Sequence, residues 1–196
     1  SSIDRQGRYA YGNQPNLAAW NMAQLATALL PLTADREASI ARFTEIVQGF
    51  GDIFDREYAA VFARKIGLTP SEETSALVDE LLRMMANIGA DYTLCFRALA
   101  TGESHAHLGA HPDFAYWHAR WQAAGPAQGA LAQVNPAIIP RNHLMEAMIS
   151  DAVAGDMQLF HALHEALKAP FSHCDTPRFI AAPDPQEVVT QTFCGT

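Results

Sequence analysis

The sequence predicts an all-α protein, and two features of the whole chain lead to this prediction. Apolar residues recur with the 3.6-residue period of an amphipathic helix, whereas the alternation typical of a strand is nearly absent. Hydrophobic residues make up 49% of the 196 positions, which is enough to build a packed core. We therefore expect a multi-helix domain.

The first predicted helix follows a loop of residues 1–14 and runs from Pro15 to Pro31. Asn13 or Gln14 can cap it, and a proline is tolerated in the first turn because the N–H groups there have no intrahelical acceptor. A proline inside a helix removes a hydrogen bond, so the helix should end at the second proline.

Two further helices are predicted before residue 68. Thr33 or Asp35 begins the second, and the third covers residues 52–67. Lys65 and Gly67 at its end supply the basic last turn and the glycine cap that are typical of a helix C-terminus.

The clearest helix start in the sequence is Thr69–Glu72, which combines a capping sequence with a proline for the first turn. This helix should end at Gly89, and Asp91 caps the short helix that follows. Residues 101–112, TGESHAHLGAHP, are rich in Gly, Ser, His and Pro, so we expect a loop there.

The C-terminal helices are separated by proline and glycine signals. A tryptophan-rich helix is predicted for residues 113–124, and a broken stretch leads from it to a turn at Asn135–Pro136. Pro140 opens the next helix, and Asp156 caps the last one, which should stop at Pro170.

Residues 171–196 form a proline-rich tail that we expect to run extended, because proline disfavours a helical conformation at its own and the preceding position. The predicted division of the chain is therefore an entering loop at residues 1–14, a helical domain at residues 15–170 and this tail.

Charge and hydropathy exclude several classes of partner. The formal net charge is −8, and the 13 basic residues are scattered, which argues against nucleic-acid binding. The apolar runs are far shorter than a membrane span, and the first residues lack the basic-then-apolar order of a secretory signal. We expect a cytoplasmic protein that binds neither nucleic acid nor membrane.

Histidines are the main candidates for metal ligands. His105, His107 and His111 fall in the predicted loop, and His161 and His164 share a helical face. Imidazoles at such spacing can bind zinc or nickel when a carboxylate joins them. A loop without a packed scaffold does not fix such geometry, so we predict no metal site and keep metal binding as an alternative.

The remaining side chains of interest have structural interpretations. At helical spacing, Trp117, Trp121 and Tyr116 are more typical of a core than of a platform for stacking bases. Cys95 is predicted to be a buried apolar residue, and Cys174 lies in a polar turn where exposure is expected. The self-contained catalytic signatures, such as G-x-S-x-G and G-x-x-x-x-G-K-[ST], do not occur.

Several strings occur in a characteristic order, namely GRYAYGNQP, WNMAQLATALLPL, DYTLCFRAL, VNPAIIPRNHLMEAMISDAVAGD and a terminal CGT. Together they resemble the C-terminal part of the selenoprotein O family, the large pseudokinase-like proteins called YdiU in bacteria. The resemblance spans essentially the whole chain. It implies that the helices correspond to the C-lobe and the C-terminal extension of a protein-kinase-like fold.

The resemblance also implies an activity for the full-length protein, which is transfer of AMP from ATP to Ser, Thr or Tyr hydroxyls of proteins with Mg²⁺ or Mn²⁺. The family strings that handle the phosphates and the metal, H-G-V-x-N-T-D-N and D-Y-G-P-F, do not occur here. We therefore expect no catalytic, cofactor-binding or metal-binding residue in this segment. Its implied role is a scaffold, and its implied partners are the N-terminal kinase-like part and the protein substrates.

The opening string contains the residues that the resemblance makes candidates for positioning the neighbouring loop or lining the acceptor side, namely Arg8, Tyr9, Asn13 and Gln14. The structural interpretation is a clasp, in which Arg8 donates to carbonyls or a carboxylate while Tyr9 and Tyr11 pack on the helix of Trp20. A guanidinium has five donors and suits cross-bracing, which favours the clasp.

Cys194 occupies a place near the C-terminus where the family carries cysteine or selenocysteine. In some bacterial members this cysteine forms a disulfide, and its partner there would lie at or before Ser1. A redox role for Cys194 and a tail residue without consequence both stay open. The alternative to an enzyme scaffold is an independent helical module that docks a partner through an apolar groove.

Overall fold

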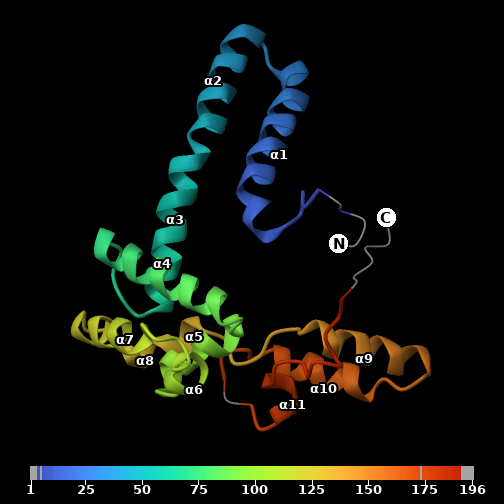
Figure 1. Ribbon diagram of the computed structural model, residues 1–196. Helices are drawn as coiled ribbons and strands as arrows, with labels where there is room; N and C mark the ends of the chain where they lie inside the picture. Colours follow the sequence, from blue (N-terminus) through green and yellow to red (C-terminus); the bar gives the residue numbers. More distant parts are fainter. Residues whose placement is uncertain (1–3, 5, 173, 191–196) are drawn as a thin grey trace. The chain divides into compact units, whose positions relative to one another are not determined.

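Asp4, residues 6–172 and residues 174–190 are described by the computed structural model, and every regular element among them is a helix (Figure 1). The predicted all-α class is confirmed. The elements up to residue 65 are η1 (Tyr11–Asn13), α1 (Gln14–Leu29), η2 (Leu30–Leu32), α2 (Arg36–Gln48) and α3 (Phe50–Lys65). Those that follow are α4 (Glu72–Asn87), α5 (Tyr92–Thr101), α6 (Ser104–Leu108), α7 (Phe114–Ala123), α8 (Gln128–Val134), α9 (Asn142–Val153), α10 (Gln158–Leu167) and α11 (Pro177–Ile180).

The chain divides into two compact units, and the division falls within α3. The first unit comprises residues 1–58 and 190–196, and the second comprises residues 59–189. The predicted boundaries at residues 14 and 170 separate an entering loop, a helical domain and a tail. These parts are not the same as the two compact units, so the boundaries stay predictions. No helix among the described residues combines the length and the hydropathy that crossing a membrane requires.

The first unit contains α1, α2 and the start of α3, and α1 and α2 lie alongside each other (Figure 1). Pro31 lies in η2 and ends α1, as its missing N–H and its ring require. Asp35 caps α2 because its carboxylate accepts a hydrogen bond from the Ala38 amide at 3.0 Å. Neither α1 nor α2 contains a buried residue.

The second unit is built around a large apolar cluster supplied by α3 to α8. Two tryptophans of α7 lie at its centre, and each is 1% exposed. The indole N–H of Trp117 donates to the Leu77 carbonyl at 2.8 Å, and that of Trp121 donates to the Ile66 carbonyl at 2.7 Å. Buried indoles are stable only when their N–H groups find acceptors, and both do. The prediction that these tryptophans are core residues is confirmed, whereas Tyr116 is exposed.

A second, smaller cluster lies under α9, α10 and α11. Its buried members are Ala137, Ile138, Leu144, Leu163 and Phe179. The carbonyl of Pro170, just after α10, accepts hydrogen bonds from the amides of Ala137 and Ile138 at 2.7 and 3.2 Å. The segment that follows α10 is therefore held against the residues that precede α9.

Three helices lie where the sequence predicted irregular chain. Residues 101–112 are not a continuous loop, because α6 occupies Ser104–Leu108. Its first and last residues, one turn apart, are both buried, so tertiary burial overrides the loop-forming composition. Helix α8 lies in the predicted broken stretch, and the short α11 begins at Pro177 inside the predicted extended tail.

Candidate functional site

The opening loop of the first unit is organised by the carboxylate of Asp4. Its Oδ1 accepts a hydrogen bond from the Arg8 amide at 2.9 Å, and its Oδ2 accepts one from the Tyr9 amide at 2.7 Å. The hydrogen bond from the Tyr9 amide is the main reason why the pKa of Asp4 lies below its usual value. Both carboxylate oxygens are therefore engaged in folding the loop.

Two side-chain amides join this loop to the start of α1. Gly7 has a φ of 65°, which a residue with a Cβ rarely adopts, and its carbonyl accepts a hydrogen bond from Asn13 Nδ2 at 2.8 Å. Gln14 Nε2 donates to the Tyr9 carbonyl at 2.9 Å. The glycine and the two amides of GRYAYGNQP thus close the turn on itself.

The guanidinium of Arg8 lies over an aromatic face. Its Cζ is 5.0 Å from the centre of the Trp20 ring and 5.7 Å from that of Tyr9, which are cation–π distances. Within the described part of the chain this guanidinium donates no hydrogen bond, so the loop is braced by Asp4, Asn13 and Gln14 instead. Tyr11 is 82% exposed.

An open hollow of about 400 Å³ adjoins the Arg8 guanidinium and is lined by Arg8, Asn13, Asn16, Leu17 and Trp20. The predicted roles of Arg8, Tyr9, Asn13 and Gln14, in positioning a loop or lining an acceptor, stay predictions. The sequence reasoning missed Asp4. The pattern Asp-x-x-Gly, an acceptor three residues before a turn glycine, is the signal that could have found it.

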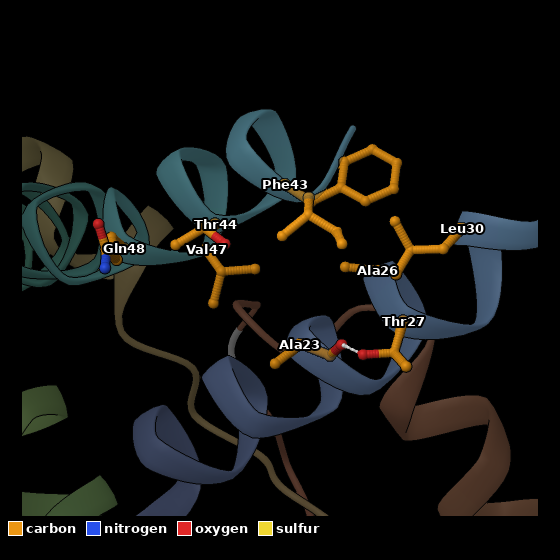
Figure 2. A pocket seen from close by; sticks show the side chains of 9 residues that line it. Ala23, Ala26, Thr27, Leu30, Phe43, Thr44, Val47 and Gln48 are labelled. Atoms are coloured by element: carbon orange, nitrogen blue, oxygen red, sulfur yellow. Dashed lines mark hydrogen bonds between the residues drawn. The ribbon is translucent and has the colours of Figure 1, made fainter. Parts of the chain in front are cut away.

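A second concave site lies between α1 and α2. Figure 2 shows side chains of the two helices facing each other across it. The cavity has a volume of about 360 Å³ and its lining residues are Ala23, Ala26, Thr27, Leu30, Ile40, Phe43, Thr44, Val47 and Gln48. We call it the α1–α2 groove. None of these nine side chains carries a charge.

The histidines are distributed over several small aromatic contacts. His105 on α6 lies against Phe114 and His118, with ring centres 4.9 and 5.3 Å apart. Desolvation, together with the neighbouring His105, lowers the pKa of His118. His164 stacks on Phe160 in α10. In the part of the chain that the structure covers, no three His, Cys, Asp or Glu side chains are grouped as metal ligands.

The cysteine predictions have different outcomes. Cys95 is buried, as predicted, and burial, with a contribution from the charge of Asp91, raises its pKa to about 11. Cys174 is only half-buried rather than exposed, and its thiol donates to the Thr176 carbonyl at 3.6 Å. Cys194 lies outside the described residues, so its predicted redox role stays a prediction.

The second unit contains a buried polar joint that the sequence did not reveal. Lys65 Nζ donates to Asn135 Oδ1 at 2.9 Å, and Asn135 Nδ2 donates to the Lys65 carbonyl at 2.8 Å. The ammonium also lies 4.4 Å from the centre of the Phe96 ring. Burial lowers the pKa of Lys65 to about 8, whereas the Phe96 face and the Asn135 oxygen stabilise the charged form.

Asn135 belongs to the string VNPAIIPRNH, and Arg141 of the same string makes a second joint. Arg141 is 7% exposed and donates to the two oxygens of Asp91 at 2.6 and 3.2 Å. A third joint is made by Arg97, whose Nη1 lies within 3.2 Å of the carbonyls of Ala132, Asn135 and Phe171. In the second unit, Asn135, Arg141 and Arg97 of the family-like strings therefore connect segments that are distant in the sequence.

Comparisons with known proteins agree with the resemblance that the strings carry. A family profile described as Protein adenylyltransferase SelO matches residues 1–168. The protein nucleotidyltransferase YdiU of Ruegeria pomeroyi is 44% identical over 206 residues, a match that takes in 100% of this chain and 43% of the relative. The YdiU proteins of Jannaschia sp. and of Mycobacterium sp. strain KMS are 47% and 40% identical, again over 100% of this chain, and 44% and 43% of their own lengths are covered.

The chain thus spans less than half the length of the curated relatives that it matches, and it corresponds to their C-terminal portion. The family profile extends over both units described above. On these matches, the chain belongs to the SelO family of protein adenylyltransferases, known as YdiU in bacteria.

Proposed function

We propose that this chain is the helical C-terminal part of an ATP-dependent protein adenylyltransferase that transfers AMP to Ser, Thr or Tyr hydroxyls of proteins. In this proposal the segment is a scaffold, and the nucleotide, with Mg²⁺ or Mn²⁺, is held by the portion of the longer protein that precedes it. The direct partner of the segment is that kinase-like portion.

The observation that carries the proposal is the unequal packing of the two units. The second unit has a closed apolar core, whereas α1 and α2 have no buried residue. Apolar side chains on these two helices, among them Trp20 at 51% and Ile40 at 45% exposure, remain uncovered. Helices stabilised by packing need a surface on which to bury such side chains. A scaffold that braces a larger protein supplies that surface.

The side chains of the opening loop support the proposal that the nucleotide binds in another portion of the longer protein. Mg²⁺ takes several oxygen ligands, and Asp4 is the one carboxylate among residues 1–14. The nearest hollow is lined by one guanidinium, two side-chain amides and two apolar side chains, which do not fit a metal-bound triphosphate. We derive no catalytic step from these residues. Arg8 and Tyr9, with Asn13 and Gln14, are proposed to position the neighbouring loop of the longer protein or to line its acceptor side.

A second candidate is an independent interaction module without a catalytic role. The closed core of the second unit favours it, because such a unit can fold without the rest of a longer protein. The two functions differ in what the longer protein does. The scaffold requires an adenylyl-transferring partner on the same polypeptide, and the module does not.

The test compares the full-length Ruegeria pomeroyi relative with the 196-residue chain. Each is incubated with ATP, Mg²⁺ and a mixture of acceptor proteins, and the adenylyl adduct on protein hydroxyls is measured by mass spectrometry. We expect adducts with the relative and none with the chain alone, and ATP binding by calorimetry should follow the same pattern. Tight ATP binding by the chain alone overturns the scaffold role, and a relative that forms no adduct overturns the activity.

A further inference from the structure

We propose that the α1–α2 groove is a docking site for one apolar helix from the remaining portion of the longer protein. This inference rests on the proposed function and narrows it, because it assigns the contact between the scaffold and the rest of the enzyme to a particular surface. The groove lies wholly within the first unit.

The chemistry of the groove selects an apolar occupant. Ala23 and Ala26 line it on the α1 side, and their small side chains let another backbone approach closely. Thr27 Oγ1 donates to the Ala23 carbonyl at 2.9 Å, so this hydroxyl is already satisfied within α1 (Figure 2). Phe43 and Val47 of α2 face this side, as Figure 2 shows. A charged segment would lose hydration here without gaining a counter-ion.

The groove is also open enough to receive a side-chain ridge. Ile40, which lines it, remains 45% exposed, and the cavity volume of about 360 Å³ is not filled by either helix. Two paired helices present a furrow between their side-chain rows, and a third helix packs into such a furrow by inserting its own row. An amphipathic helix laid in an apolar groove is a common recognition mode.

The length of the relatives is the reason why we propose the same polypeptide as the source of this helix. The chain covers 43% of the Ruegeria pomeroyi relative, and the family profile includes α1 and α2. More than half of each such polypeptide is therefore tethered to these helices. Tethering raises the effective concentration of a segment, so even a modest apolar contact becomes populated.

Two variants remove the groove in opposite ways. Ala26→Trp fills the cavity with an apolar ring, and Val47→Asp places a charge on its wall. Each has a matched control on the neighbouring position of the same helix, outside the groove lining. These controls are Leu25→Trp, at a residue that is 59% exposed, and Ile46→Asp, at a residue that is 55% exposed.

The measurement is binding of the 196-residue chain to the complementary portion of the Ruegeria pomeroyi relative, by sedimentation velocity over a range of concentrations. We expect association by the unchanged chain, a loss of about tenfold or more in affinity for each groove variant, and less than about twofold for each control. Far-UV circular dichroism verifies that each variant keeps the helix content of the unchanged chain. Ala26→Trp is the decisive variant, because filling a purely structural cavity leaves association unchanged.

Each other outcome overturns the proposal. Absence of association does so, and so does equal weakening by groove and control variants. If the chain alone forms a dimer that Ala26→Trp abolishes, the groove belongs to a second copy. The adenylyl-transfer assay on the intact relative is independent of this result. If the chain associates with the complementary portion but the intact relative transfers no AMP, the proposed function is overturned and the groove assignment stands. If the relative transfers AMP but the groove variants associate as tightly as the unchanged chain, the groove assignment is overturned and the proposed function stands.

Discussion

Asp91 and Arg141, which lie 50 residues apart in the sequence, connect the starts of two helices through one carboxylate. Asp91 Oδ1 caps α5 by accepting from the Leu94 amide at 2.8 Å, and both oxygens also accept from the nearly buried guanidinium. This arrangement joins the large cluster, to which α5 contributes, with the smaller cluster under α9. A charge pair of this kind is costly to break at one end only.

Asp91→Asn is expected to destabilise the second unit strongly. Asparagine can still cap α5, but it leaves the Arg141 guanidinium buried without a counter-ion, which costs about 3–5 kcal/mol. The free energy of unfolding by urea measures the effect. The control is Glu80→Gln, which removes the ion pair with Arg120 at 2.7 Å, and this pair is about a third exposed. We expect a loss below about 1 kcal/mol there, and equal losses would contradict the buried-pair argument.

The same carboxylate predicts an acid dependence. Partial burial raises the pKa of Asp91, but the hydrogen bonds from Arg141 and the Leu94 amide, with the charge of Arg141, outweigh burial, so the net pKa is lowered. The unfolded chain then binds the proton more readily than the folded one. This stabilisation is complete above the ordinary aspartate pKa of about 4 and is lost as the pH falls through the lowered value. Unfolding by urea between pH 2 and pH 6 should show it, and Asp91→Asn should flatten that part of the curve.

Lys65 predicts a second rise of stability with pH, in the alkaline range. Its folded pKa is lowered to about 8, below the unfolded value of 10.5, so the unfolded state binds more protons between these values. The free energy of unfolding should therefore rise from pH 8 to about pH 10.5, relative to Lys65→Met. Taking the difference between the two proteins removes the contribution of Cys95, whose raised pKa acts in the other direction.

Amine labelling gives an independent measurement of the same group. Lys65 and Lys168 are the two lysines of the chain, and Lys168 lies on the surface with its Nζ 2.6 Å from Glu165. We expect the labelling rate of Lys65, followed by peptide mass spectrometry, to reach half its maximum near pH 8. A labelling rate of Lys65 that keeps rising well above pH 8 would contradict the lowered pKa of this group.

Asp4→Ala is expected to release the opening loop without unfolding α1. The Arg8 and Tyr9 amides lose their acceptors, so their hydrogen exchange should accelerate, whereas exchange in the middle of α1 should stay unchanged. Asp4→Asn is the conservative control, because it retains one acceptor oxygen and should give an intermediate rate. Unchanged exchange at Arg8 and Tyr9 would show that Asp4 does not organise the loop in solution.

Interactions within a few residues are the part of this structure that the sequence could predict. The cap at Asp91 was predicted, and Asp35 was one of the two predicted starts of α2, because the acceptor and the amide that it caps lie three residues apart. The burial of Trp117 and Trp121 followed from their spacing on one helix. Family membership was predicted as well, because long unusual strings carried it.

Contacts between distant segments were beyond such reasoning. Helix α6 was missed because its stability comes from burying Ser104 and Leu108 in a cluster built by other helices. The hydrogen bond between Lys65 and Asn135 connects residues that lie 70 positions apart, and no periodic pattern in the sequence indicates it. The α1–α2 groove depends on how the two helices are rotated about their axes, which the side chains of both determine together.

The Pro170 carbonyl has a practical consequence for anyone who trims this protein. The family profile ends at residue 168, a natural place to cut an expression clone. Such a cut would discard the acceptor for the Ala137 and Ile138 amides and the ring of Phe179, which fills the smaller cluster. The end of the family profile therefore differs from the end of the packed unit. The shortened polypeptide would have a cavity in the smaller cluster under α9 and α10.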